Sequence, residues 1–241
     1  MIAPRRAMVL AAGKGVRLRP ITERVPKPLV AVGGRPLIDY ALGLLVAAGV
    51  DEIVVNAHHL ADAIEAFVAA YGKAHPSLRL HVSREETLLE TGGGVARALD
   101  RLGDGPFYVL NSDVILRDGA TPALLRLAEA FDPARMGALL LLQPLSEAIG
   151  FEGKGDYARA PDGRLHSRGD AASAPFVFTG AQILSPALFD DAPGGAFSLR
   201  LLYDIAERKR RLFGLVHDGA WLHVGTPDAL REAERALRGA P

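Results

Sequence analysis

The chain has 241 residues, of which 49% are hydrophobic and 23% are charged, and this suits a globular protein with a sizeable core. Lysine and arginine balance aspartate and glutamate at 28 each, so the formal net charge is zero, which argues against a nucleic-acid binder driven by bulk positive charge. The chain has no cysteine, which excludes disulfides, thiolate catalysis and cysteine-ligated metals.

The first half of the chain alternates between short apolar segments and segments with helical spacing of apolar residues. We expect strands at residues 8–12, 52–55, 78–82, 107–110 and 138–142, and helices at residues 36–48, 60–71, 94–102 and 122–131. This order predicts an α/β fold with a Rossmann-like, mostly parallel sheet flanked by helices on both faces. Ligands of such sheets bind beyond the carboxyl ends of the strands.

The second half of the chain has a different character. We expect a hairpin over residues 157–167 around P-D-G, strands at 176–178, 181–184 and 213–224, a helix over 198–211, and a last helix opening at T-P-D, with Thr226 as its cap. This half predicts a small antiparallel annex on the parallel sheet. No linker or repeat divides the sequence, so we expect one domain over residues 1–241, with lobes at 1–142 and 143–241.

A glycine turn follows the first expected strand, where residues 8–20 read M-V-L-A-A-G-K-G-V-R-L-R-P and P-K-P-L follows at 26–29. Dinucleotide and P-loop patterns both fail, and Leu18 stands where the dinucleotide motif needs its third glycine. Gly13 and Gly15 allow the backbone to approach an anion closely. Arg17 can bind phosphate oxygens with its fork of N–H groups, and Lys27 adds a point charge. The stretch therefore predicts a phosphate site and argues against a dehydrogenase.

Five later motifs continue the pattern, and all of them appear in the sequence in the same order as in one enzyme family: E-T-G-G-G at 90–94, N-S-D-V at 111–114, G-K-G-D-Y at 153–157, F-T-G at 178–180 and W-L-H-V-G-T at 221–226. Together with the glycine turn and P-K-P they resemble, over almost the whole chain, the signature of the sugar-1-phosphate nucleotidyltransferases. Within this family, the short length and L-L-E-T-G-G-G are most similar to the N-acetylmuramate α-1-phosphate uridylyltransferases of peptidoglycan recycling. The sequence has no hexapeptide repeats, so it does not resemble the bifunctional relatives that carry a β-helix.

The resemblance implies a nucleotide-diphospho-sugar transferase fold and an enzyme that makes a nucleotide-sugar and pyrophosphate from a nucleoside triphosphate and a sugar-1-phosphate. A phosphate oxygen of the sugar attacks the α-phosphorus in line, so no covalent enzyme intermediate is needed. Positioning and charge neutralisation can carry such a transfer without a protein nucleophile.

The resemblance also implies roles for individual residues. Catalysis would rest on Arg17, Lys27 and Asp113, and the lobe at 1–142 would bind the nucleotide through Ala12, Gly13, Gly15, Val16, Arg17, Lys27, Glu90, Gly92 and Asn111. The lobe at 143–241 would bind the sugar through Gly155, Asp156 and Thr179. Asp113 would ligate Mg²⁺ between the phosphates.

His223 departs from the family pattern, because many relatives carry a second metal-ligating aspartate at that place in W-x-D-V-G-T. Imidazole can ligate metals, but Mg²⁺ prefers oxygen. Three readings stay open. His223 ligates a softer ion such as Mn²⁺ or Co²⁺, it contacts phosphate as a cation, or Asp113 holds Mg²⁺ with only phosphates and water to complete the shell.

The sequence leaves the substrate pair and the fine function open. Glucose-1-phosphate with dTTP or UTP, and mannose-1-phosphate with GTP, are alternatives to UTP with N-acetylmuramate α-1-phosphate. A nucleotide-sugar sensor without turnover is an alternative of another class, motivated by His223 alone. We expect no nucleic-acid or membrane partner and a cytoplasmic location, because no apolar run approaches the roughly 18 residues of a membrane helix and residues 7–12 are too short for a secretory core. The sequence does not indicate the oligomeric state.

Overall fold

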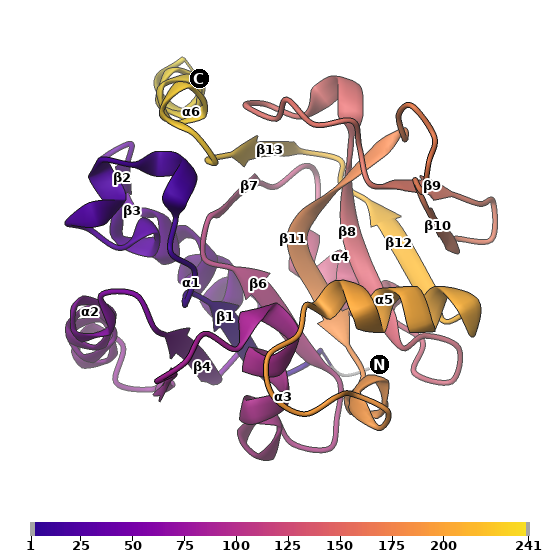
Figure 1. The fold of residues 1–241 in the computed structure, drawn as a ribbon, viewed down its shortest axis with the longest axis horizontal. Coiled ribbons are helices and arrows are strands. Elements are labelled where there is room, and N and C mark those ends of the chain that lie inside the picture. Colours follow the sequence, from indigo (N-terminus) through magenta and orange to yellow (C-terminus); the bar gives the residue numbers. More distant parts are fainter. Residues whose placement is uncertain (1–2, 240–241) are drawn as a thin grey trace.

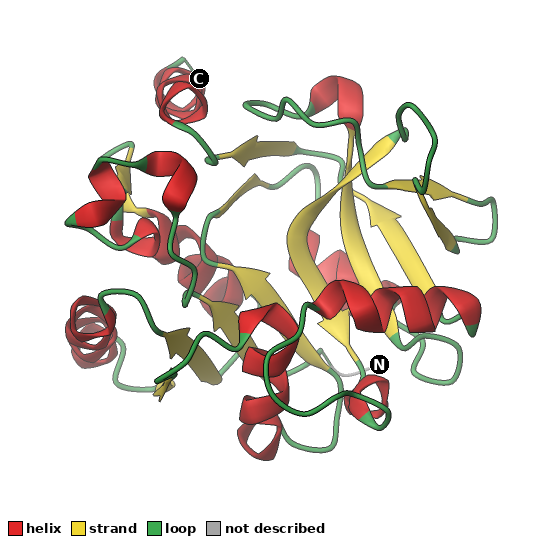
Figure 2. Ribbon diagram, viewed as in Figure 1, coloured by secondary structure: helices red, strands yellow, loops and turns green. Residues whose placement is uncertain are grey.

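The computed structural model describes residues 3–239 and has a nine-stranded sheet at its centre, with helices on both sides (Figures 1 and 2). The strands of this sheet are β1 (Arg6–Leu10), β4 (Glu52–Ala57), β5 (Arg79–Arg84), β6 (Phe107–Asn111), β8 (Ala138–Pro144), β9 (Tyr157–Arg159), β10 (Leu165–Ser167), β11 (Phe176–Leu184) and β12 (Leu212–Val216). Two small ribbons pair β2 (Ala31–Val32) with β3 (Arg35–Pro36) and β7 (Val114–Arg117) with β13 (Ala220–His223). The helices are α1 (Leu37–Ala47), α2 (Ala61–Ala74), α3 (Glu90–Leu102), α4 (Ala123–Ala130), α5 (Leu199–Arg208) and α6 (Pro227–Arg238).

The first half of the chain builds the parallel part of the sheet. β1 pairs in parallel with β4 on one side and with β6 on the other, and β5 adds to β4 in parallel. The carboxyl ends of β1, β4 and β6 therefore lie together at one edge of the sheet. The prediction of an α/β fold with a mostly parallel sheet and an antiparallel annex is confirmed.

Each face of the sheet is covered by its own set of helices because successive side chains of a strand point to opposite faces. Ala7 and Val9 of β1 pack with the buried faces of α1, α2 and α4, whereas Met8 packs with α3 and α5. Figure 1 shows α3 and α5 in front of the sheet. The two hydrophobic clusters exclude water from both faces of β1, β4 and β6, as the nearly continuous apolar sequences of these strands predicted. β5 at the edge of the sheet is only partly buried.

β11 joins the second half of the chain to the first. It runs antiparallel to β6 through residues 181–184 and antiparallel to β8 along its other edge, and the register shifts between Phe178 and Gln182. At this shift Gly180 has a φ of +90°, and a Cβ there would lie 2.7 Å from the Asn111 amide nitrogen. The sequence predicted two strands at this place. The structure has one irregular strand, because the T-G pair makes a kink without ending the ladder.

Other expected elements also differ from the structure in their extent. The expected strand over 213–224 is two strands, β12 and β13, which belong to different sheets. α3 begins at Glu90 instead of residue 94, and α5 ends at Arg208, after which Arg210 adopts a left-handed φ of +57°. The expected hairpin around P-D-G is present as β9 and β10, and Thr226 caps α6 by accepting a hydrogen bond from the Ala229 N–H. β7 had no counterpart in the expected elements.

A third, smaller cluster lies apart from the main sheet. Ala233 of α6 packs there with Leu222 and Val224 next to β13 and with Val30 and Val32, which follow the segment of Lys27. The ribbon of β7 and β13 and helix α6 therefore pack against β2 and the residues that follow P-K-P (Figure 1).

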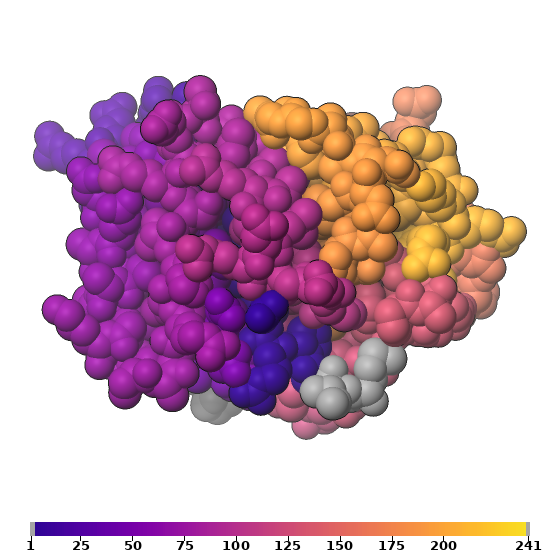
Figure 3. All heavy atoms as spheres, turned by 90° about the horizontal axis from the view of Figure 1, so that it is seen from below, coloured from indigo at the N-terminus to yellow at the C-terminus, as the bar shows by residue number. Residues whose placement is uncertain are grey.

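The two halves of the chain lie side by side on one face of the molecule (Figure 3). The nine-stranded sheet runs through both halves, because β11 pairs with β6 and with β8. None of the helices within residues 3–239 combines the length and the apolar character needed to cross a membrane.

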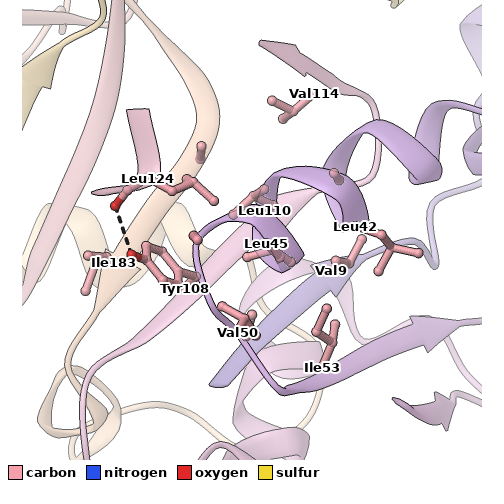
Figure 4. Packing of buried hydrophobic residues seen from close by; sticks show 14 of the residues in the cluster. Val9, Leu42, Leu45, Val50, Ile53, Tyr108, Leu110, Val114, Leu124 and Ile183 are labelled. Carbon is pink, nitrogen blue, oxygen red and sulfur yellow. Dashed lines mark hydrogen bonds between the residues drawn. The ribbon is translucent and has the colours of Figure 1, made fainter. Parts of the chain in front are cut away.

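Replacing Tyr108 by phenylalanine should lower the free energy of unfolding by about 1 kcal/mol. Tyr108 is fully buried in the larger cluster, and its hydroxyl donates a 2.8 Å hydrogen bond to the Leu124 carbonyl at α4 (Figure 4). The variant loses this bond without leaving a cavity. Urea unfolding of the variant measures the loss.

Tyr71→Phe is the matched control, because the half-buried Tyr71 hydroxyl has no hydrogen-bond partner among residues 3–239. Its change should stay within about 0.5 kcal/mol. Equal stabilities for the two variants would show that the hydrogen bond from Tyr108 to α4 contributes nothing to the free energy of unfolding.

Candidate active site

A cavity of about 450 Å³ opens at the carboxyl ends of β1, β4 and β6. Leu10, Asn56 and Asn111 contribute to its wall from the ends of these three strands. The predicted nucleotide-binding residues line it with the exception of Gly92: Ala12, Gly13, Gly15, Val16, Arg17, Lys27, Glu90 and Asn111. Asp113 lines it as well. The structure thus brings together residues from three distant segments, because parallel strands end at one edge of a sheet.

The glycine turn leaves room for a ligand at one glycine and packs tightly at the other. A Cβ at Gly13 would meet no atom within 4 Å, so the backbone faces open space there. Gly15 has a left-handed φ of +60°, and a Cβ at this position would lie 2.9 Å from the Cβ of Lys27. The Thr22 hydroxyl donates a 2.8 Å hydrogen bond to the Gly15 carbonyl and fixes the turn. Gly15 therefore allows the segment of Lys27 to approach the turn.

Two cations in different surroundings face the cavity. Arg17 is exposed and has no ion-pair or hydrogen-bond partner within the described part of the chain, residues 3–239. Lys27 lies between two prolines, and its ammonium group pairs with the Asp113 carboxylate. The side chains of Lys27 and Asp113 are only 15% and 22% exposed, so water screens this pair weakly.

The ionisation of Asp113 follows from its surroundings. Burial alone would raise the pKa of its carboxyl, but the charge and hydrogen bond of Lys27, with a smaller contribution from His223, hold this pKa below its usual value. The carboxylate is therefore ionised at neutral pH and available to a cation.

His223 is the last residue of β13, and its imidazole ring packs against two aromatic rings. Its ring lies 5.5 Å from the ring of Trp221 and 5.6 Å from that of Phe151, measured between centroids. Burial lowers the pKa of His223, an effect that Asp113 opposes and that Lys27 and Arg17 reinforce, so the imidazole is neutral at pH 7. A Cβ at Gly225, which lines the cavity, would lie 2.4 Å from the His223 Nε2 atom. The uncharged imidazole of His223 thus lies directly behind Gly225 in the cavity wall.

The protein groups that could hold a metal ion are few. No group of three or more histidine, aspartate or glutamate side chains that could hold a metal ion occurs within residues 3–239. Mg²⁺ commonly binds through one or two carboxylates together with substrate phosphates and water. Asp113 fits the part of such a carboxylate, whereas the neutral His223 is a poor ligand for this ion.

Another part of the cavity wall is formed by Leu88, Glu90 and Thr91, where α3 begins. Glu90 is exposed and has a left-handed φ of +60°, which is unusual for a residue with a side chain. Such strain is found where the surrounding structure holds the backbone firmly. The N–H of Leu199 donates a 2.9 Å hydrogen bond to the Thr91 hydroxyl, and the N–H of Gly92 donates one of 2.8 Å to the Phe197 carbonyl. This wall is therefore bound to the segment that leads into α5.

Gly92 lies behind this wall. It is buried, and a Cβ at Gly92 would lie 2.3 Å from the ring of Phe197, so a close approach of two chain segments explains this glycine. Gly93 and Gly94 are equally tight, because a Cβ would lie 2.3 Å from the Gly195 carbonyl oxygen at the first and 2.8 Å from the Asn56 amide nitrogen at the second.

The residues expected to bind the sugar do not line the cavity. Thr179 is buried, and its hydroxyl donates a 3.0 Å hydrogen bond to the Leu141 carbonyl. The Asp156 carboxylate accepts a 2.9 Å hydrogen bond from the Phe178 N–H, and a Cβ at Gly155 would lie 2.2 Å from the Ala174 carbonyl oxygen. In this structure Thr179 joins β11 to β8, whereas Asp156 joins the start of β9 to β11.

Several residues of the cavity wall were not among the expected site residues: Asn56, Leu88, Ser112, Ser198 and Gly225. Leu88, Ser112 and Gly225 lie within the quoted motifs L-L-E-T-G-G-G, N-S-D-V and W-L-H-V-G-T, whereas Asn56 and Ser198 lie outside every motif. Asn56 is the last residue but one of β4, and its place at the carboxyl end of a parallel strand is the feature that could have identified it. Ser198 reaches the cavity only through the contacts of its neighbours with α3. The wall holds a glycine turn, the two cations Arg17 and Lys27, and two carboxylates, of which Asp113 lies against Lys27. This set suits a polyphosphate and a cation bound with it.

Comparisons with known proteins find relatives along the whole chain. Residues 6–151 match the model of the nucleotidyl transferase family. The chain is 42% identical over 239 residues, covering 99% of both sequences, to an N-acetylmuramate alpha-1-phosphate uridylyltransferase of Caulobacter vibrioides. It is 38% identical to a protein of the same name from Neisseria meningitidis, with 98% of this chain and 99% of the relative covered.

Solved structures show the same fold at low sequence identity. A putative glucose-1-phosphate thymidylyltransferase from Bacillus anthracis has a TM-score of 0.79 at 19% identity and covers 98% of this chain and 96% of its own. A UDP-glucose pyrophosphorylase in complex with UDP-glucose has a TM-score of 0.78 at 19% identity and covers 99% of each chain.

Proposed function

The chain belongs to the nucleotidyl transferase family, and from this premise we propose that its cavity joins UTP to N-acetylmuramate α-1-phosphate and releases pyrophosphate. The product is UDP-N-acetylmuramate. The reaction serves the recycling of peptidoglycan sugars and takes place in the cytoplasm.

One observation carries the proposal: the polyphosphate site at the ends of β1 and β6 belongs to a chain that matches two uridylyltransferases along its whole length. The choice of UTP and of N-acetylmuramate α-1-phosphate follows the names of these two relatives. The glycine turn, Arg17, Lys27 and Asp113 support the chemistry that all sugar-1-phosphate nucleotidyltransferases share.

The residues of the cavity divide the work of the transfer. The N–H groups of the turn at Gly13 to Gly15 and the guanidinium of Arg17 bind the β- and γ-phosphates, which leave as pyrophosphate. Lys27 neutralises charge on the α-phosphate while a phosphate oxygen of the sugar attacks the α-phosphorus. A bond forms from this oxygen to phosphorus, and the bond from phosphorus to the pyrophosphate oxygen breaks. The attacking oxygen is already anionic, so no general base is required.

Asp113 is the residue that would hold a divalent cation, which the family implies, and Mg²⁺ is the ion that fits a single carboxylate and phosphate oxygens. When bound, this ion supplies charge neutralisation on the triphosphate. A softer ion such as Mn²⁺ or Co²⁺ would bring His223 into play. In the free protein the ammonium group of Lys27 pairs with the same carboxylate and balances its negative charge.

The two lobes divide the substrates. We assign the nucleotide to residues 1–142, because nearly all of the cavity wall comes from this part of the chain. The sugar enters from the side of Ser198 and Gly225, which are the contributions of residues 143–241 to the wall.

Pyrophosphate release tests the proposed function. UTP, dTTP, GTP, CTP and ATP are each combined with the 1-phosphates of N-acetylmuramate, N-acetylglucosamine, glucose and mannose, in Mg²⁺ and again in Mn²⁺. We expect turnover with UTP and N-acetylmuramate α-1-phosphate to exceed that of every other pair by at least tenfold. Preference for another pair would overturn the assignment of substrates. Nucleotide binding without turnover in either ion would overturn the proposal that the protein is an enzyme.

A further inference from the structure

A buried pair of polar side chains connects two walls of the cavity. Asn56 and Glu85 are only 2% and 3% exposed. The Asn56 amide group donates a 2.8 Å hydrogen bond to Oε1 of Glu85, and its Oδ1 atom accepts one of 2.7 Å from the N–H of Ala11. Oε2 of Glu85 accepts a 2.9 Å hydrogen bond from the N–H of Leu89.

The two backbone groups at the ends of this chain of hydrogen bonds belong to two segments that lead into different parts of the cavity wall. Ala11 leads directly into the glycine turn, whereas Leu89 precedes Glu90 and Thr91. Asn56 itself lines the cavity. Three hydrogen bonds therefore fix the position of the glycine turn relative to residues 88–91.

α3 shields the pair. Gly94 passes so close that a Cβ would lie 2.8 Å from Nδ2 of Asn56 and 3.0 Å from Oε1 of Glu85. No cation pairs with Glu85 within the described residues, so its buried carboxylate depends on these two neutral donors. Buried polar side chains fix one geometry when each of them has its hydrogen-bond partners. A buried polar group left without a partner lowers the stability of the fold.

We infer that Asn56 and Glu85 are positioning residues of the nucleotide cavity: they set its width and thereby its affinity for a nucleoside triphosphate and its choice of base. The inference rests on the proposed function, because it takes the cavity as the nucleotide site. It concerns only the part of the cavity between Ala11 and Leu89, and not the phosphate contacts of Arg17 and Lys27.

The direction of the hydrogen bonds gives the inference a sharp test. Both ends of the chain are backbone N–H donors, so each end needs an acceptor. Glu85→Gln places an amide N–H₂ group opposite either Asn56 or the Leu89 N–H, and Asn56→Asp places two carboxylates against each other. The double variant Asn56→Asp with Glu85→Gln exchanges the two functional groups. The carboxylate now at position 56 accepts from the Ala11 N–H and from the amide at position 85, and the oxygen of that amide accepts from the Leu89 N–H. All three bonds return at the same net charge.

Calorimetric titration with UTP, CTP and GTP is the primary measurement, and it needs no turnover. We expect each single variant to bind UTP at least tenfold more weakly and to discriminate less between the three nucleotides. The double variant should recover the affinity of the unaltered protein to within about threefold. Steady-state kinetics should show the same changes in the KM for UTP, with a much smaller change in the KM for the sugar phosphate.

Tyr203→Phe is the matched control. It breaks another buried side-chain pair, the 2.7 Å hydrogen bond from the Tyr203 hydroxyl to Gln182, on the face of the sheet covered by α5. It should lower stability without changing nucleotide affinity. If a single variant does not fold, Asn56→Ala provides a milder one, because it removes the bonds to Ala11 and Glu85 without opposing two charges.

Two results would overturn the inference: single variants that bind UTP as tightly as Tyr203→Phe does, or a double variant that stays as weak as the poorer single one. A failure of the proposed function is distinguishable from both. In that case the unaltered protein prefers another triphosphate, and the same four-way comparison with that nucleotide still tests the pair.

Discussion

Replacing Lys27 with methionine should lower turnover by a factor of about 10²–10³. At the same time it should tighten the binding of Mn²⁺ to the free protein. Lys27 is the cation paired with Asp113 in the cavity, and both side chains are largely withdrawn from water. In the proposed mechanism the ammonium group neutralises the α-phosphate during transfer, and methionine has a similar length and no charge.

The gain in metal binding follows from the same ion pair. In the free protein the ammonium of Lys27 lies directly against the Asp113 carboxylate, where it repels a second cation. Removing one unit of positive charge that lies directly against Asp113 in a partly buried site should raise the affinity of Asp113 for a divalent cation by roughly tenfold or more. Electron paramagnetic resonance of free Mn²⁺ measures this change without substrate or turnover.

Lys73→Met is the control, because Lys73 is an exposed lysine in the last turn of α2 and does not line the cavity. It should leave both turnover and Mn²⁺ binding unchanged. Asp113→Asn with Lys27→Met should lose the tightened Mn²⁺ binding. A Lys27→Met variant with normal turnover would remove Lys27 from the mechanism, and unchanged Mn²⁺ affinity would remove Asp113 as the metal-binding carboxylate.

Gly93→Ala should lower the free energy of unfolding by about 3 kcal/mol, more than a typical single substitution. A Cβ at Gly93 would lie 2.3 Å from the carbonyl oxygen of Gly195, and this atom belongs to the backbone, so no side-chain rotation relieves the clash. The segment around Phe197 would have to move, and the hydrogen bonds from Gly92 and Gly93 to the Phe197 carbonyl would lengthen. Urea unfolding gives the change in stability.

Gly194→Ala is the matched control in the same segment. A Cβ at Gly194 would meet no atom within 4 Å, and its φ lies outside the left-handed region, so alanine should be tolerated within about 0.5 kcal/mol. Equal stability of the two variants would mean that the segment 195–199 is free to move away from α3. The nucleotide affinity of Gly93→Ala should fall as well, because Glu90 and Thr91 lie on the same wall.

The sequence predicted the parallel half of the fold because that half depends on local patterns. Short apolar strands alternate with amphipathic helices, and the order of these elements leaves few arrangements for the sheet. The glycine turn could be recognised for the same reason, since Gly13, Gly15 and Arg17 stand within five residues. The second half was harder, because the T-G pair in β11 looks like a break between two strands but is only an irregularity within one.

The contacts between distant segments could not be predicted. Asn56 and Glu85 are 29 residues apart, and neither is unusual where it stands in the sequence. Gly92 was expected to contact the nucleotide, but it lies against Phe197, more than a hundred residues further along the chain. A glycine required by close packing and one required by a ligand look the same in a sequence. The left-handed backbone conformation of Glu90 could not be predicted either, because no local sequence rule places a residue with a side chain in that conformation.

The small cluster around α6 has a consequence for the order in which the protein matures on the ribosome. Val30 and Val32, which follow Lys27, pack with Ala233 and with Val224 at the other end of the chain. The parallel strands can pair as soon as β6 has emerged, but the support of the Lys27 segment appears only when the last helix has been synthesised. A nascent chain should therefore hold a nearly complete sheet for some time before the segment of Lys27 is fixed in place, and the proposed activity should appear only after α6 has been synthesised.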